Sequence, residues 1–230
     1  MTVVPGWHID LDEEQIHRTQ GASLARVLAN PRGRAAWTGA LADARELVQG
    51  AALWEFFAVE AIRHGRVFLA GGARLGGGPL AQVIAGADHL GVVVCTIGPA
   101  LGSRAHEQQR SGNLLRGLLL NNLGIWAVDK LRQEISCRIE DDAAAEGLRV
   151  STSLSPGESD WPLSDQKVIF SMLETEQIGV SLNRKSLVMS PVKSVSLVMG
   201  RGVGPLGREG ESHCDYCTIR DRCAYRGRRS

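Results

Sequence analysis

The chain has 230 residues, of which 43% are hydrophobic and 22% are charged, and its formal net charge is +1 at pH 7. These values are ordinary for a soluble globular protein with one good core and room for a small appendage. The near-zero net charge excludes an overall electrostatic attraction to nucleic acid or to an anionic membrane, and no stretch approaches the length of a membrane span. The N-terminal stretch lacks the pattern of a signal peptide, so we expect a cytoplasmic protein whose five cysteines are ligands or free thiols rather than disulfides.

The first part of the chain predicts helices and strands in alternation. A short strand is expected over residues 7–11, after which Asp12 caps a first helix. A second helix is expected after Pro31, with apolar residues at helical spacing: Trp37, Leu41, Ala44 and Val48. Two further strands are expected over residues 52–59 and 66–69.

Residues 71–79 are rich in glycine and resemble a phosphate-binding loop in composition. They lack the Gly-Lys-Ser/Thr ending that would contact phosphate and magnesium. We therefore interpret this stretch as a flexible loop.

The middle of the chain predicts a buried strand followed by two helices. Residues 90–96 are apolar almost throughout, which favours a strand covered on both faces. Helices are expected over residues 101–109 and 113–146, the second being the longest in the chain. Its predicted apolar stripe consists of Leu114, Leu118, Ile125, Val128, Leu131, Ile135 and Ile139. Gly117 and Gly124 interrupt this helix and are candidate sites of close packing.

The stretch 151–202 predicts a turn, a helix, a loop and a strand in that order. Ser155-Pro156-Gly157 has the composition of a turn, and Trp161-Pro162-Leu163 keeps the chain extended. Ser164 is expected to cap an amphipathic helix that Gly179 ends. The strand is expected over residues 194–199, with Val195, Leu197 and Met199 on one side and two serines on the other. The two proline-bounded loops are stiff enough to hold backbone groups towards a ligand.

The order of elements shows neither a βαβ rhythm nor an internal repeat, which favours an α+β fold with a mixed or largely antiparallel sheet flanked by helices. We expect one such domain over residues 1–200. A glycine-rich tether would follow over residues 201–212, and a cysteine cluster with a basic tail over residues 213–230.

Three cysteines near the C-terminus, Cys214, Cys217 and Cys223, form the sharpest chemical pattern in the sequence. Their Cys-x2-Cys-x5-Cys spacing suits a [4Fe–4S] cluster, with zinc and unliganded thiols as the alternatives. The fourth ligand would come from a distant cysteine, and we predict Cys137 on the longest helix, because Cys95 lies within the buried strand. The spacing resembles the iron–sulfur staple of certain RecB-like nucleases, although that similarity covers only about a dozen residues.

Four stretches resemble the C-terminal activation domain of cobalamin-dependent methionine synthase and similar stand-alone corrinoid-associated proteins. They are Ser155-Pro156-Gly157, Trp161-Pro162-Leu163 through Gln166, Leu187-Val188-Met189-Ser190-Pro191 and Lys193-Ser194-Val195-Ser196. The resemblance implies a domain that docks on a corrinoid protein and binds S-adenosylmethionine beside the corrinoid. The residues implied to contact that cofactor are Ser155, Pro156, Gly157, Glu158 and Trp161.

Two positions depart from the adenosylmethionine motif of that family. The family has an arginine four residues before the glycine and a tyrosine directly after it, whereas this chain has Ser153 and Glu158. A serine cannot supply the fixed charge that an arginine gives to a carboxylate. We therefore predict that adenosylmethionine binds weakly or not at all, unless Arg149 or Arg184 replaces the lost contact.

The leading functional hypothesis is an accessory or reactivation protein of corrinoid-dependent methyl transfer, whose cluster either delivers electrons to oxidised cobalt or is a staple that closes the tail onto the domain. Its partner would be a corrinoid-binding protein or methyltransferase, and the sequence assigns no catalytic residue. A second hypothesis is a non-catalytic binding module with a structural zinc or iron–sulfur site. A nucleic-acid enzyme of the stapled nuclease type is disfavoured, because the chain lacks a spaced set of acidic residues and lysine that would hold magnesium.

Overall fold

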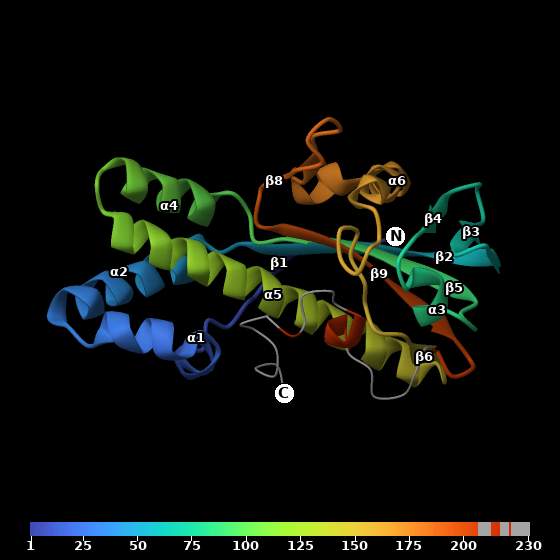
Figure 1. Ribbon diagram of the computed structural model, residues 1–230, viewed down its shortest axis with the longest axis horizontal. Helices are drawn as coiled ribbons and strands as arrows, with labels where there is room; N and C mark the ends of the chain where they lie inside the picture. The colour runs from blue at the N-terminus through green and yellow to red at the C-terminus, as the bar shows by residue number, and fades with distance from the viewer. Residues whose placement is uncertain (207–212, 217–220, 222–230) are drawn as a thin grey trace.

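A computed structural model describes residues 1–206, 213–216 and 221 of the chain (Figure 1). Among these residues, seven strands form one sheet in the order β4-β3-β2-β5-β9-β6, and β1 also pairs with β2. Every ladder in the sheet is antiparallel. The expected α+β fold with a largely antiparallel sheet and flanking helices is therefore confirmed.

The strands of the sheet are β1 (Thr2–Trp7), β2 (Gly50–Arg63), β3 (Arg66–Leu69), β4 (Arg74–Gly76), β5 (His89–Thr96), β6 (Arg149–Val150) and β9 (Ser194–Gly202). A separate hairpin joins β7 (Ser181–Leu182) to β8 (Met189–Ser190). The α-helices are α1 (Glu13–Leu28), α2 (Pro31–Leu47), α3 (Leu80–Val83), α4 (Ala100–Arg110), α5 (Leu114–Ala145) and α6 (Gln166–Met172). Short 3-10 turns are η1 (Leu163–Asp165), η2 (Thr175–Ile178) and η3 (His213–Tyr216).

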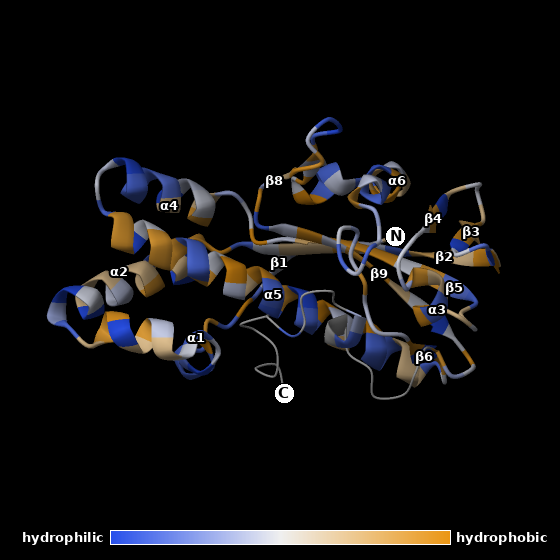
Figure 2. Ribbon diagram, in the orientation of Figure 1, coloured by the Kyte–Doolittle hydropathy of each residue, from blue (hydrophilic) through white to orange (hydrophobic). Residues whose placement is uncertain are grey.

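Helices and loops pack on both faces of the sheet, and a separate hydrophobic cluster lies on each face. Helices α1, α2, α4 and α5 pack with Val93 and Cys95 of β5 to form the first cluster. Alternate residues of the same strand, Val92 and Val94, face the second cluster with α3, α6 and Trp161. This arrangement explains why β5 is apolar throughout, since side chains alternate between the two faces of a strand. In Figure 2 the strands are accordingly mostly orange, while α2 and α5 carry both colours.

The N-terminal strand lies earlier than predicted. Residues 2–7, rather than 7–11, pair with β2, and the register places Val3 opposite Leu53. The segment after β1 instead inserts Ile9 and Leu11 into the first cluster. Asp12 then caps α1 as predicted, because its Oδ1 atom accepts a hydrogen bond from the backbone N–H of Glu14 at 2.8 Å.

Helix α5 has the predicted extent, but the predicted stripe is wrong in its first half. Leu114, Leu118 and Ile125 are exposed, whereas Leu120 and Leu123 are buried. The reason is a close approach of α4: a Cβ atom on Gly117 would lie 2.5 Å from the Cγ of Gln109. The glycine side of α5 therefore faces inwards, and the leucines on the other side face solvent.

Helix α6 is shorter than predicted. Ser164 does not cap it, because the 3-10 turn η1 precedes the helix and no side-chain cap is formed. The chain becomes extended at Leu173, with φ −123° and ψ 144°, and Gly179 ends the later turn η2 instead. Strand β9 has Val195, Leu197 and Met199 towards the first cluster, as predicted, and runs on to Gly202.

No helix in the described part of the chain combines the length and the apolar character that a membrane span requires.

Candidate functional site

The segment Ser155–Trp161 forms a compact turn that is closed by its own backbone. The N–H of Gly157 donates to the carbonyl of Trp161 at 2.8 Å, and the N–H of Trp161 donates to the carbonyl of Glu158 at 2.9 Å. The Glu158 carboxylate accepts from the N–H of Ser155 at 3.3 Å. Positive φ angles at Gly157, Ser159 and Asp160 make the reversal tight. The predicted turn is thus confirmed.

The turn is anchored through Trp161 and Asp165. The Trp161 ring is buried in the second cluster, and its Nε1–H donates to Asp165 Oδ2 at 2.8 Å. The same oxygen accepts from the N–H of Gly76 at 2.9 Å. One carboxylate therefore fastens the turn, the start of α6 and strand β4 to one another.

The glycine-rich stretch packs against the turn, so the prediction of a flexible loop is wrong for residues 74–78. Part of the stretch is strand β4, which pairs with β3. A Cβ atom on Gly77 would lie 2.5 Å from Pro162 Cδ, and one on Gly78 would lie 2.2 Å from the Ser159 carbonyl oxygen. Both glycines also have positive φ angles. They are glycines because the turn lies directly against their backbone.

The five residues implied to contact a cofactor differ in accessibility. Gly157 is exposed, Ser155 and Glu158 are half-buried, and Pro156 and Trp161 are buried. Pro156 and Trp161 therefore position the turn, and the backbone around Gly157 is the part that faces solvent. Glu158 is engaged within the turn through its carboxylate.

Two buried polar atoms, one in the turn and one shortly after it in the sequence, have no hydrogen-bond partner within the described residues. They are the Oγ atom of Ser159 and the Oε1 atom of Gln166. Buried polar groups normally pair with protein, water or ligand. The region behind the turn thus retains unused hydrogen-bonding capacity.

A buried arginine of α5 contacts Ser153, two residues before the turn begins. Arg132 is 8% exposed, and its Nη1 atom donates to Ser153 Oγ at 3.3 Å. Its Nε atom donates to Asp129 at 3.3 Å, so the charge is paired on the same helix. Arg149 and Arg184, the two arginines considered from sequence, are both exposed.

Sequence reasoning missed Arg132 because it is far from Ser153 along the chain. The signal was nevertheless present, since Arg132 falls between Val128, Leu131 and Ile135 on the apolar stripe of α5. A charged residue in such a position needs a partner.

The matching stretch that ends at Pro191 is held at the start of β9. The Ser190–Pro191 peptide bond is cis. The Oγ atom of Ser194 donates to the Pro191 carbonyl at 2.7 Å and lies 2.9 Å from Thr96 Oγ1. These contacts tie the loop before β9 to the end of β5.

The cysteines fall into two groups. Cys95 is buried in β5, where burial raises the pKa of its thiol to about 12, while Cys137 is exposed on α5. The accessibility of Cys137 is compatible with its predicted role, and the enclosed position predicted for Cys95 is confirmed. The other predicted ligands lie outside the described side chains: Cys214, Cys217 and Cys223. Tyr216, between the first two, packs against the second cluster.

No group of three or more histidine, cysteine or acidic side chains with a metal-binding arrangement occurs among the side chains of residues 1–206, 215, 216 and 221. The metal prediction therefore rests on the sequence pattern of the C-terminal cysteines.

No protein-family model matches the chain, and a search of curated proteins also finds no match. A search of solved structures finds the crystal structure of the MetH reactivation domain bound to AdoHcy, at a TM-score of 0.62 and 11% sequence identity. The match covers 99% of this chain and 91% of that one. The similarity extends over the whole domain and establishes a shared fold.

Proposed function

We propose that this protein is an accessory factor of corrinoid-dependent methyl transfer that docks on a corrinoid-binding protein. The observation that carries the proposal is the match over 99% of the chain to a domain described as a reactivation domain. The motifs around Ser155–Trp161 and Ser190–Pro191 support it, because they resemble the methionine synthase activation domain and form two anchored loops in this fold.

The exposed side of the anchored turn is the surface we assign to docking. Gly157, Pro162 and Leu163 face solvent there, and Leu163 is 41% exposed although it is a large apolar residue. The buried Trp161 and the glycines beneath keep this surface in one conformation. A preformed apolar surface favours binding because less conformational freedom is lost on association.

The docking proposal is tested by mixing the protein with a corrinoid-binding protein that carries cobalt in the Co(II) state. We expect a complex on gel filtration and a change in the cobalt absorption spectrum. Leu163→Asp is expected to weaken the complex about tenfold or more, because a carboxylate would be desolvated in the interface. The matched control is Leu114→Asp, which replaces an equally apolar residue that is 67% exposed at the N-terminal end of α5. Equal binding by both variants would contradict the assigned surface.

We further propose that Cys214, Cys217 and Cys223 bind a [4Fe–4S] cluster with Cys137 as the fourth ligand. Such a cluster would supply one electron at a time to oxidised cobalt. The local spacing of the three thiolates supports this assignment, as does the accessibility of Cys137. Structural zinc is the alternative, and it would favour the second hypothesis of a binding module without redox activity.

Anaerobic purification with iron, sulfide and zinc analysis tests the cluster. We expect a brown protein with about four irons per chain that loses iron when Cys137 is replaced by alanine. Cys95→Ala is the control and is expected to change packing rather than iron content. Stoichiometric zinc without iron would contradict the cluster, whereas full iron content in Cys137→Ala would move the fourth ligand elsewhere.

Adenosylmethionine is proposed to bind weakly or not at all. Ser153 stands at the position of the family's arginine, and Arg132, which contacts Ser153, is already paired with Asp129. Calorimetric titration is expected to show no micromolar binding. If such binding occurs, its loss in Arg132→Met would identify Arg132 as the residue that replaced the missing contact.

A further inference from the structure

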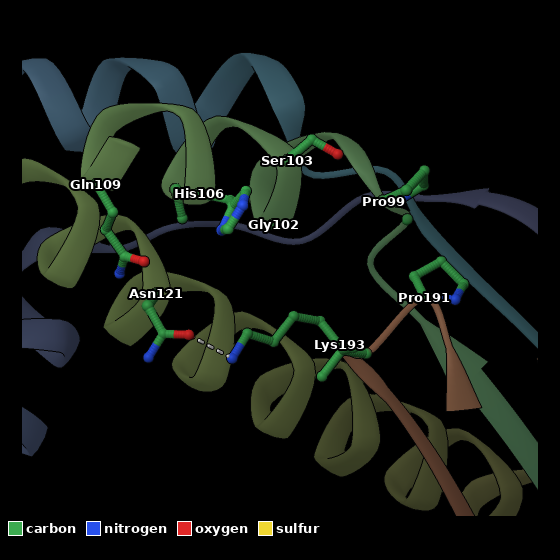
Figure 3. Close-up of a pocket in the computed structure, with 11 residues that line it drawn as sticks. Pro99, Gly102, Ser103, His106, Gln109, Asn121, Pro191 and Lys193 are labelled. Carbon is green, nitrogen blue, oxygen red and sulfur yellow. Dashed lines mark hydrogen bonds between the residues drawn. The ribbon is translucent and has the colours of Figure 1, made fainter. Parts of the chain in front are cut away.

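A cavity of about 450 Å³ opens between α4, the N-terminal part of α5 and the connection from β8 to β9 (Figure 3). None of its lining residues belongs to the Ser155–Trp161 turn. Its polar lining consists of Ser103, His106 and Gln109 from α4, Asn121 from α5, and Lys193. Proline, alanine and valine side chains supply the apolar part of the lining, and no acidic residue contributes to it.

Lys193 is a half-buried cation without a carboxylate partner in the described part of the chain. Its Nζ atom donates to Asn121 Oδ1 at 2.9 Å, as Figure 3 shows, and no charged group among the described residues contributes to its pKa shift. Burial lowers the pKa of the Lys193 ammonium. A partly desolvated positive charge beside a neutral amide is favourable for an anion, which would restore the lost electrostatic stabilisation.

The helix backbone at Gly124 positions the Lys193 side chain, and the cavity has open space at Gly102. A Cβ atom on Gly124 would lie 3.3 Å from Lys193 Cε, so the lysine stem rests on bare helix backbone. Across the cavity, Gly102 lies in the first turn of α4, and a Cβ atom there would meet no atom within 4 Å. The lysine therefore lines the cavity with its ammonium bonded to Asn121, and the space beside Gly102 is open.

We propose that this cavity binds a small molecule that carries a carboxylate or phosphate group. Lys193 receives the anionic group, with Asn121 and His106 as neighbouring hydrogen-bonding groups. Pro99, Pro191 and Val192 contact the apolar part of the ligand. This site is separate from the docking surface and does not depend on a corrinoid partner.

The test is an NMR titration of the full ¹⁵N-labelled chain with sodium phosphate and, separately, with sodium acetate at constant ionic strength. Saturable shifts of the Gly98, Gly102 and Lys193 amides are expected with at least one probe, while sodium chloride alone gives none. Saturation by phosphate only, acetate only or both would identify the anionic group that the cavity accepts. The absence of saturable shifts with both probes would overturn the proposal.

Two variants remove the site in different ways. Lys193→Gln is expected to weaken binding about tenfold or more, since hydrogen bonds to charged groups contribute more than neutral ones. Lys185→Gln, which removes an exposed lysine between β7 and β8, is the matched control and should bind as the wild type does. Gly102→Leu fills the open space without changing charge and should abolish the shifts while the protein melts normally. Unchanged affinity in Lys193→Gln or in folded Gly102→Leu would overturn the proposal.

Discussion

Three side chains that can carry a charge are buried or half-buried in this fold. Arg132 interrupts the apolar stripe of α5 and pairs with Asp129 and Ser153. Lys193 lies between α5 and the start of β9 with only an amide as its described partner. Cys95 is enclosed in the first cluster. Burial shifts the pKa of Lys193 and of Cys95 towards the uncharged form, because a buried site penalises charge.

The first prediction concerns thiol reactivity. Cys95 should resist alkylation by iodoacetamide in the folded protein at pH 8, because burial raises its pKa to about 12 and blocks access. Cys137 is exposed and should react within the same experiment if no metal occupies it. Peptide mapping by mass spectrometry measures both. Equal labelling of the two cysteines in the native state would contradict the described burial.

The second prediction concerns Lys193 and pH. Since burial lowers its pKa in the folded state, the charged lysine reduces stability at neutral pH, and this cost disappears as pH rises through the folded pKa towards the unfolded value. Lys193→Met should therefore raise the free energy of unfolding at pH 7, by at most about 1 kcal/mol because the ammonium is still partly hydrated. The gain should shrink towards pH 10. Urea unfolding at both values measures it, and a gain that grows with pH would contradict the argument.

At the scale of elements, the Ser155–Trp161 turn brings together distant parts of the chain. Strand β4, the Ser155–Trp161 turn and the start of α6 meet at the carboxylate of Asp165. The glycine-rich stretch completes this unit because the turn lies against its backbone. The support of the proposed docking surface therefore comes from residues 89 positions apart in sequence.

The third prediction tests this contact with a pair of glycines. Gly78→Ala should lower the free energy of unfolding by about 2 kcal/mol more than Gly72→Ala. Both glycines have positive φ angles, but a Cβ atom at Gly78 would lie 2.2 Å from the Ser159 carbonyl oxygen, while one at Gly72 meets nothing within 4 Å. Thermal unfolding of both variants measures the difference. Equal losses would mean that backbone conformation, not contact with the turn, selects glycine at residue 78.

At the scale of the whole molecule, one sheet separates two hydrophobic clusters. Strand β5 lies between β2 and β9 and supplies side chains to both clusters. Helices α1, α2 and α4 gather on the first cluster at one end of the molecule, and β3, β4 and α3 lie at the other end (Figure 1). Because the clusters share their central strands, neither is expected to unfold while the other remains packed.

The fourth prediction follows from that shared sheet. Val92→Ala and Val93→Ala remove methyl groups from the second and first clusters, respectively, at two fully buried positions. Each should lower stability by about 2 kcal/mol and leave a single cooperative transition. Circular dichroism at two wavelengths during heating measures this. A separate early transition in one variant would show that the two clusters unfold independently.

Much of the fold was determined locally. Asp12, Pro31, the continuous apolar run of β5 and the alternating residues of β9 each predict their element, because capping, proline geometry and side-chain pattern act within a few residues. The turn at Ser155–Gly157 was predicted for the same reason. The C-terminal cysteine pattern is likewise a property of sequence alone, and its metal remains a prediction.

Only the tertiary structure decided which distant residues meet. The sequence of α5 shows apolar residues on several sides, and the close approach of α4 at Gly117 selects the side that is buried. The glycine-rich stretch has the composition of a flexible loop, but in the folded protein the turn packs on Gly77 and Gly78. The Arg132–Ser153 contact and the Lys193 cavity likewise join separate elements. Such contacts depend on how whole elements pack, and local periodicity carries no information about that packing.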